Sequence, residues 1–419
     1  MGFVDIDKWQ EIGATLSKHK LRTALTALGV GWGIFMLVIM LGAGTGLENG
    51  TKHQFSKFAN NMMGFWGMKT TKAYMGYKPG KRIRFNNDDI AALQRSVPEI
   101  EYLAPRAYLE SQFQVKFGNE KGTFQVSGTT PDLAKILPVT IPQGRFINAK
   151  DETEKRKVAV VGEYARKLLC KNDENMVGNY ISIKGVYFLV IGILKSARDG
   201  DDGQEDENAI YLPLSTLQQS FNQPNSIAWF LCNIKEAHNP DQAEEKIKAT
   251  LRSLHQVHPE DNQAIGSFSL ARESAEIQSV FTGIKLFTWI VGFGTILAGI
   301  IGVANIMLVV VKERTREIGI RKSLGATPNS IISMILQEAI VLTFAAGYIG
   351  LVLGIGLLAL LDKFLRATQS ESMFFRQPEV NMGFALSALV LLVVAGALAG
   401  FYPAWKAASV NPVEALSHE

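Results

Sequence analysis

Cysteine is scarce in this chain of 419 residues, which contains only Cys170 and Cys232. Both lie in one polar block, and two cysteines cannot build a disulfide framework that replaces a hydrophobic core. A bond between them would require that block to lie outside the cytoplasm. Buried thiols are our expectation, because unpaired cysteine is among the most buried residue types.

The chain also lacks the short motifs that mark common enzymes. It contains no G-x-x-x-x-G-K-[ST] segment, and Gly76–Lys81 is one residue short of such a loop and lacks the Ser or Thr. It contains no H-E-x-x-H segment, and among its scattered histidines only His255 and His258 are close. We therefore expect no catalytic residue, no directly bound cofactor and no metal site.

Neither sign of charge is in large excess, since the formal net charge is +4. Much of the basic excess lies beside apolar runs, where it reports membrane topology rather than nucleic-acid binding. We therefore expect contact with membrane lipids and no nucleic-acid partner.

Long apolar runs dominate the rest of the sequence. Each is free of charged residues and long enough to span a bilayer; they are Leu25–Leu47, Leu286–Val311, Val341–Leu361 and Phe384–Tyr402. Four spans place both termini on one side, and the Lys and Arg residues near the first and second runs make that side cytoplasmic. The polar block between these two runs then lies outside.

The predicted domain order covers the whole sequence. By residue number it is a cytoplasmic interfacial helix (1–22), the first span (23–47), a stalk with the extracytoplasmic domain (48–282), the second span (283–311), a cytoplasmic elbow (312–327), an amphipathic lead-in with the third span (328–361), an outer loop (362–380), the fourth span (381–403) and a cytoplasmic tail (404–419). The fold class is thus a four-helix membrane protein with a large insertion.

Short strands and helices alternate in the polar block, which predicts an α+β region of two subdomains. The expected strands are Phe113–Phe117, Thr123–Gly128, Val158–Val161, Tyr180–Ile183 and Val186–Ile193, and the expected helices are Asp88–Ser96, Glu163–Leu169 and Asp241–Leu254. The dipeptide Lys184-Gly185 between two of these strands predicts a hairpin turn. The acidic Arg198–Glu207 segment reads as a solvated hairpin tip, because it lacks the EF-hand spacing of a calcium loop.

The segment Lys312–Ala326, which we call the elbow, organises the chain between the second and third spans. Helical spacing, a terminating Gly325 and the pair Thr327-Pro328 predict a short helix, a cap and a new helix. An ordinary positive-inside loop is one interpretation, and a docking site for a cytoplasmic partner is the other.

Small residues recur at four-residue spacing in the spans, which predicts close helix packing between two copies of the chain. The glycines concerned are Gly29, Gly33, Gly350, Gly354, Gly396 and Gly400. Glu338 is the carboxylate nearest a span and is a functional candidate, although a position at the cytoplasmic interface is the simpler interpretation.

Several segments together resemble the MacB/FtsX-like permease family of ABC transporters. The elbow with its following helix, E-R-T-R-E-I-G-I-R-K-S-L-G-A-T-P-N-S-I-I-S-M-I-L-Q-E-A, carries the strongest likeness. The C-terminal F-Y-P-A-W-K-A-A-S-V-N-P-V-E-A-L and outer-block segments such as V-S-G-T-T-P-D-L and V-G-N-Y-I-S-I add to it. Agreement among many motifs is far more specific than any single motif. Trp405 departs from the family pattern, in which a basic residue is more frequent.

The resemblance implies a permease subunit of the inner membrane, driven by a separate ATPase that holds ATP and magnesium. It implies a porter-like part and a smaller β-rich part in the outer domain, a second permease copy or paralogue, and a periplasmic adaptor where an outer membrane exists. ATPase motion would pass along stalk helices to the outer domain, a mechanism called mechanotransmission that exports or extracts a substrate at the outer face. The residues implied to couple to the ATPase are Glu313, Arg314, Arg316, Glu317, Arg321 and Lys322.

Two other functions remain open at this point. An FtsX-like signalling permease would control an extracytoplasmic cell-wall hydrolase, but short members of that kind have much smaller outer domains. A passive membrane anchor or extracellular enzyme has no supporting motif, and it predicts that charge reversal in the elbow has no effect.

Overall fold

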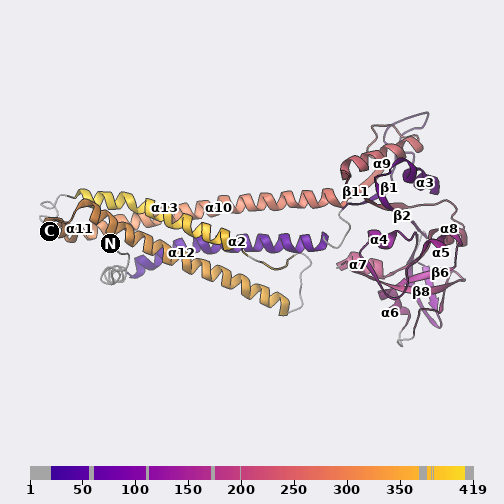
Figure 1. Cartoon of the computed structure of the whole chain (residues 1–419), viewed down its shortest axis with the longest axis horizontal. Helices are drawn as coiled ribbons and strands as arrows, with labels where there is room; N and C mark the ends of the chain where they lie inside the picture. The colour runs from indigo at the N-terminus through magenta and orange to yellow at the C-terminus, as the bar shows by residue number, and fades with distance from the viewer. Residues whose placement is uncertain are drawn as a thin grey trace. The chain divides into compact units, whose positions relative to one another are not determined.

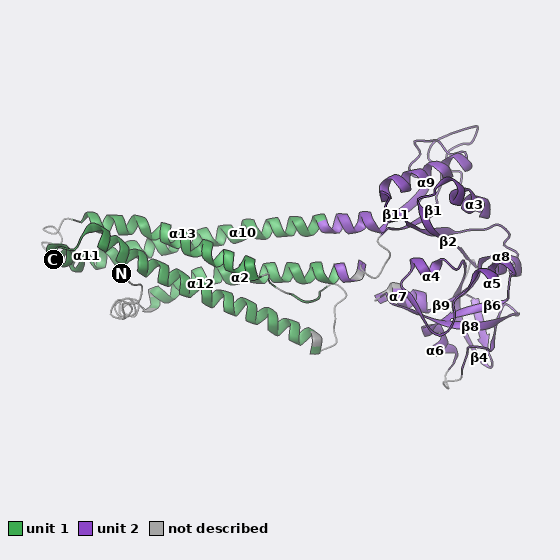
Figure 2. Ribbon diagram, in the orientation of Figure 1, with its two compact units in different colours: residues 1–51, 279–419 green, residues 52–278 purple. Residues whose placement is uncertain are grey.

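A computed structural model describes residues 20–55, 61–109, 113–170, 175–198, 200–367, 375–378, 380 and 382–410 of the protein (Figure 1). The chain forms two compact units. Unit 1 comprises residues 1–51 and 279–419, and unit 2 comprises residues 52–278 (Figure 2). The predicted interfacial helix lies outside the described residues up to residue 19, and so does the end of the predicted tail from residue 411.

Unit 1 is helical. Its elements are α2 (Lys20–Phe55), α10 (Leu270–Glu313), α11 (Thr315–Ser323), α12 (Pro328–Ala367) and α13 (Met382–Ser409), of which α2 and α10 continue into unit 2. Four of them, all except α11, are long and apolar enough to cross a membrane. The prediction of four spanning helices is confirmed. α13 continues past Pro403 to Ser409, so that proline does not end the helix.

The helices of unit 1 pack around one apolar core. Ile34 of α2, Val303 of α10 and Ala339 of α12 are fully buried in it. Close approach between α2 and α12 depends on small residues, because a Cβ at Gly31 would lie 2.9 Å from the carbonyl oxygen of Ala346. A Cβ at Gly350 would overlap the carbonyl oxygen of Gly31. The backbones therefore contact each other directly at this crossing.

Unit 2 is a mixed α/β structure built on one continuous sheet. Its strands are β1 (Met62–Gly67), β2 (Ile100–Tyr108), β3 (Phe113–Phe117), β4 (Glu120–Thr129), β5 (Val139–Gly144), β6 (Val158–Gly162), β7 (Tyr180–Ile183), β8 (Val186–Ser196), β9 (Ala209–Pro213), β10 (Trp229–Ile234) and β11 (Ile265–Ser269). Its remaining helices are α3 (Asn87–Ser96), α4 (Leu133–Ile136), α5 (Ala149–Thr153), α6 (Glu163–Leu169), α7 (Gly200–Glu207), α8 (Leu214–Ser220) and α9 (Pro240–Leu254).

The sheet divides into two parts that meet where β2 pairs with β4. One part is the antiparallel set β11-β1-β10-β2, whose core also contains residues of α3 and α9 such as Leu93 and Ile247. In the other part β4, β3, β7, β8, β6 and β9 pair in turn, and β9 pairs back onto β4 in parallel. This closes a small barrel filled by Val115, Phe188 and their neighbours. The prediction of an α+β domain with a second, β-rich part is confirmed.

Local signals explain many of these elements. β7 and β8 are joined by Lys184 and Gly185, both with positive φ (50° and 83°), as a two-residue hairpin turn requires. Asn86 and Asp89 form a reciprocal capping box at the start of α3. The predicted strands and helices named above are all present, with ends that differ by a few residues.

The prediction of a solvated hairpin tip at residues 198–207 is wrong, because Gly200–Glu207 forms helix α7. Asp206 is buried, and its carboxylate accepts hydrogen bonds from Ser196 Oγ and Arg198 Nη1, each at 3.2 Å. The Glu207 carboxylate accepts a bond from the backbone N–H of Ser196. Contacts with the end of β8 thus stabilise a helix whose composition does not favour one.

The two cysteines do not bond to each other. Cys170 lies in the barrel core and Cys232 in the core of the antiparallel part, and both are buried. Burial raises the pKa of the Cys232 thiol, because a thiolate is poorly solvated there. The expectation of buried thiols is confirmed.

Candidate functional site

The elbow forms where α10 ends and α12 begins. The backbone N–H of Gly325 bonds the carbonyl of Lys322, and that of Ala326 bonds the carbonyl of Arg321, each at 3.0 Å. Gly325 has φ +95°, so these bonds form a Schellman cap that ends α11. Thr327 then accepts a bond from the N–H of Ser330, and Pro328 opens α12. The predicted helix, cap and second helix are confirmed.

One face of the elbow is held by ion pairs to its own chain. The Arg314 guanidinium donates two hydrogen bonds of 2.9 Å to the Glu317 carboxylate and one of 2.6 Å to Glu338. The side chain of Glu338 is only 5% exposed and that of Arg314 14%. The bonds to Glu317, together with the charge of Glu338, raise the pKa of Arg314. Arg314 therefore joins the elbow to α12 in its fully charged form.

Two further basic residues also point back into unit 1. Lys322 Nζ donates to the carbonyl oxygens of Ala408 and Val410, each at 2.7 Å, and so satisfies carbonyls at the end of α13. Arg321 donates to Glu317 at 3.3 Å and contacts the sulfur of Met334. The elbow is thus tied to both α12 and α13.

The opposite face of the elbow is exposed. Arg316, Ile320 and Leu324 recur every four residues, which places them on one side of α11. Ile320 is 45% exposed and Leu324 82%. We call these three residues the outer face. Sequence reasoning had not selected Ile320 and Leu324, although their spacing from Arg316 would have identified them.

The six predicted coupling residues therefore separate into two groups. Arg314, Glu317, Arg321 and Lys322 make the contacts that hold the elbow to unit 1. Glu313 and Arg316 are exposed. Exposed apolar side chains flanked by charge can bind a groove on a partner, whereas the buried ion pair between Arg314 and Glu338 can fix the position of the elbow against α12.

Most of the glycines predicted to pack between two copies of the chain face helices of their own copy. A Cβ at Gly350 would meet Gly31, at Gly354 it would meet Val38, at Gly396 Thr343 and at Gly400 Ala339, and Gly33 faces Thr295. These faces are covered by helices of the same chain. Among the six, Gly29 alone has no atom within 4 Å of such a Cβ, so the prediction of contact between copies now rests on Gly29.

Comparisons with known proteins agree on the protein family to which the chain is similar. A family profile described as "MacB-like periplasmic core domain" matches residues 23–250, and one described as "FtsX-like permease C-terminal" matches residues 289–412. The macrolide export ATP-binding/permease protein MacB of Bdellovibrio bacteriovorus is 28% identical over 97% of this chain. The pyoverdine export ATP-binding/permease protein PvdT of Pseudomonas syringae pv. syringae is 31% identical over 96%.

The matches differ in how much of each relative they cover. The chain spans 60% of the length of that MacB protein and 58% of that PvdT protein. Among solved structures, the periplasmic region of MacB from Actinobacillus actinomycetemcomitans matches 53% of this chain and 95% of that region, with 20% identity and a TM-score of 0.43.

Proposed function

Because the chain belongs to the MacB/FtsX-like permease family of ABC transporters, we propose that it is the permease of an exporter powered by a separate ATPase that docks on the elbow. Its relatives are described as both ATP-binding and permease proteins, which supports the pairing of this chain with an ATP-binding partner. The permease itself would do no chemistry, and ATP with magnesium would be bound by that partner.

The exposed outer face of the elbow is the observation that carries this proposal. Arg316 offers charge-assisted hydrogen bonds, and Ile320 and Leu324 offer apolar area that water would leave on docking. The elbow behind them is fixed by the ion pair of Arg314 with Glu338 and by the hydrogen bonds that Lys322 donates to backbone carbonyl oxygens at the end of α13. A push on the outer face would therefore move α11 together with the ends of α12 and α13 rather than bend the elbow alone.

α10 would carry this movement along the chain, as mechanotransmission requires. It is a single helix from Leu270, directly after β11, to Glu313 at the elbow. Within unit 2 its first turn is anchored by Arg272, which pairs with Asp241 at 3.0 Å and with Glu244 of α9. Burial disfavours a charge on Glu244, but hydrogen bonds from Lys248, Ser267 and Arg272 lower the pKa of its carboxyl, which keeps this anchor ionic at neutral pH.

The charges near the spans support a topology with both termini in the cytoplasm. The elbow, with Lys312, Arg316 and Arg321 beside the apolar helices, would then face the cytoplasm of the inner membrane, and unit 2 would face the periplasm. The relatives named for macrolide and pyoverdine export favour a role in export at the outer face. A second permease copy and a periplasmic adaptor would complete the assembly.

Substitution on the outer face tests this function. Ile320→Asp should reduce substrate export and permease-stimulated ATP hydrolysis by about tenfold or more, because a carboxylate replaces a contact that has to be desolvated on docking. Leu254→Asp makes the same change at a residue of unit 2 that is 48% exposed, and it should leave both activities unchanged. Glu317 and Arg321 are poorer positions for this test, because they also hold the elbow together.

Export and ATP hydrolysis would be measured with the permease and its ATPase in proteoliposomes. Unchanged activities in Ile320→Asp, with a melting temperature equal to that of the unchanged protein, would contradict docking at the outer face. They would favour the passive anchor instead.

A further inference from the structure

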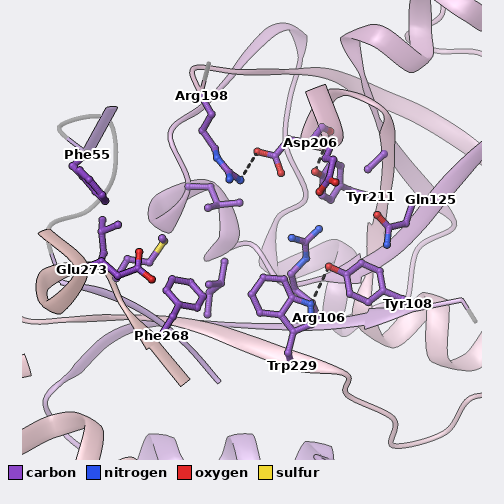
Figure 3. A pocket seen from close by; sticks show the side chains of 16 residues that line it. Phe55, Arg106, Tyr108, Gln125, Arg198, Asp206, Tyr211, Trp229, Phe268 and Glu273 are labelled. Carbon is purple, nitrogen blue, oxygen red and sulfur yellow. Dashed lines mark hydrogen bonds and ion pairs between the residues drawn. The ribbon is translucent and has the colours of Figure 1, made fainter. Parts of the chain in front are cut away.

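Unit 2 contains a cavity of about 470 Å³ where its two parts meet (Figure 3). One wall comes from Arg106 and Tyr108 of β2 and Trp229 of β10, and the facing wall includes Tyr211 of β9. A cavity of this size can hold a drug-sized molecule. We call it the Arg106 pocket.

Arg106 is a buried cation at the centre of this pocket. It is only 7% exposed, and its guanidinium lies 5.2 Å from the ring centre of Trp229, 5.3 Å from that of Tyr108 and 5.7 Å from that of Tyr211. Figure 3 shows the guanidinium pointing into the cavity between these rings. The aromatic faces attract the cation but offer no strong hydrogen-bond acceptor.

The described hydrogen-bond partners of Arg106 are neutral hydroxyl groups, those of Ser127 and Tyr211, and they leave part of its donor capacity unused. Nε and Nη2 both donate to Ser127 Oγ, at 3.4 and 3.3 Å, and a guanidinium has five N–H donors. Among the residues that the structure describes, no carboxylate forms an ion pair with Arg106. Asp206, the buried carboxylate of this pocket, instead accepts hydrogen bonds from Ser196 and Arg198. An anion that enters the cavity would stabilise this buried guanidinium, because it would accept the hydrogen bonds that the hydroxyl groups leave unused.

The other residues that line the pocket are mainly of two kinds, apolar and acidic. Met62, Leu231, Phe268 and Leu270 provide hydrocarbon surface next to the aromatic rings. Glu205 and Glu273 also line the cavity, and their negative charges would repel a ligand that carries several anionic groups. The pocket therefore suits a single anionic group attached to an apolar body.

We propose that the Arg106 pocket binds an amphiphilic organic monoanion. Its carboxylate or sulfonate would accept two parallel hydrogen bonds from Arg106, and its apolar body would lie against Met62, Leu231 and Phe268. The binding of this ligand is inferred from the residues of unit 2 alone. The further statement that the ligand is a substrate for export rests on the proposed function.

The test uses the full chain in lipid nanodiscs without ATPase, and binding is measured by calorimetry. The probes are 2-naphthoate and decanoate, each compared with its neutral amide, which keeps the shape and removes the charge. At least one carboxylate should bind about tenfold or more tightly than its amide, since a hydrogen bond to a charged group is worth roughly that factor. Arg106→Met should remove this preference, whereas Arg84→Met, at an exposed arginine of the same unit, should keep it.

A second variant keeps the test decisive if Arg106→Met does not fold. Arg106→Lys retains the charge but cannot form two parallel hydrogen bonds, so carboxylate binding should weaken severalfold while amide binding stays the same. The proposal is overturned if neither carboxylate binds more tightly than its amide, or if the preference survives both substitutions at Arg106. Because no ATPase is present, these results are independent of docking at the elbow.

Discussion

At the scale of single residues, Arg314 shows how the elbow is built. Its guanidinium bridges Glu317, three residues away, and Glu338, on the next long helix. The Glu338 carboxylate is almost completely buried. Arg314 is therefore a structural residue of the elbow.

Removing this guanidinium should destabilise unit 1. Arg314→Met removes one partner of the buried ion pair with Glu338, a change that typically costs about 3–5 kcal/mol. We expect a lower melting temperature in detergent, and adding Glu338→Gln should restore part of the loss because the buried charge is then absent as well. Arg316→Met removes the same group from the exposed outer face and should leave the melting temperature unchanged. Equal melting temperatures for the variants at residues 314 and 316 would refute this assignment.

The local part of the elbow could be predicted from sequence, but the pairing of its charges could not. Gly325 and Thr327-Pro328 act through bonds within a few residues, so the cap and the start of α12 were predictable. The contact between Arg314 and Glu338 depends on α12 folding back beside α10, and no short-range pattern contains that information. The family resemblance groups Arg314 with Arg316 as coupling residues, and the sequence alone does not distinguish the contacts that the two arginines make.

At the scale of elements, α2 and α12 cross so closely that their contact depends on glycine. A methyl group at Gly350 would overlap the backbone of Gly31, and backbone cannot move aside as a flexible side chain can. Gly350→Ala should therefore separate these helices and destabilise unit 1 by about 1–3 kcal/mol. Gly356→Ala, six residues along α12, meets no atom within 4 Å and should be neutral or slightly stabilising.

Thermal unfolding in the same detergent measures both glycine variants. A loss of stability in Gly356→Ala equal to that in Gly350→Ala would contradict the role of the crossing, because alanine favours a helix over glycine and meets no atom at residue 356. The sequence pattern predicts that the small-residue faces pack between two copies of the chain, and the structure shows that five of the six glycines face helices of the same chain. Spacing alone carries no information about which helix covers a face.

Helix α7 shows that tertiary contacts can override local sequence composition. Its sequence, G-D-D-G-Q-E-D-E, is rich in residues that disfavour helix interiors, and the acidic composition suggested a solvated turn. Tertiary contacts of Asp206 and Glu207 with the end of β8 decide the outcome. The same contacts set one wall of the Arg106 pocket, so the pocket could not be predicted from sequence.

At the scale of the whole molecule, the chain joins a bundle of spanning helices to a large folded domain through α2 and α10. α10 is continuous from the anchor at Arg272 to the elbow, and in unit 1 its Lys285 pairs with the buried Glu48 of α2 at 2.6 Å. The order of one span, an inserted domain and three further spans was predictable, because hydropathy over long windows reports it directly. The proposed docking of an ATPase on the outer face of the elbow would start a movement at one end of α10.

Site-specific photocrosslinking in native membranes tests the docking of an ATPase on the outer face. A photoreactive amino acid would replace Ile320 on the outer face. The control would carry it in place of Leu254 in unit 2. The crosslinked products would be identified by mass spectrometry. We predict that position 320 crosslinks to a separate polypeptide that contains a G-x-x-x-x-G-K-[ST] segment, and that position 254 does not. A well-expressed protein whose position 320 crosslinks to no ATP-binding polypeptide would contradict docking at the elbow.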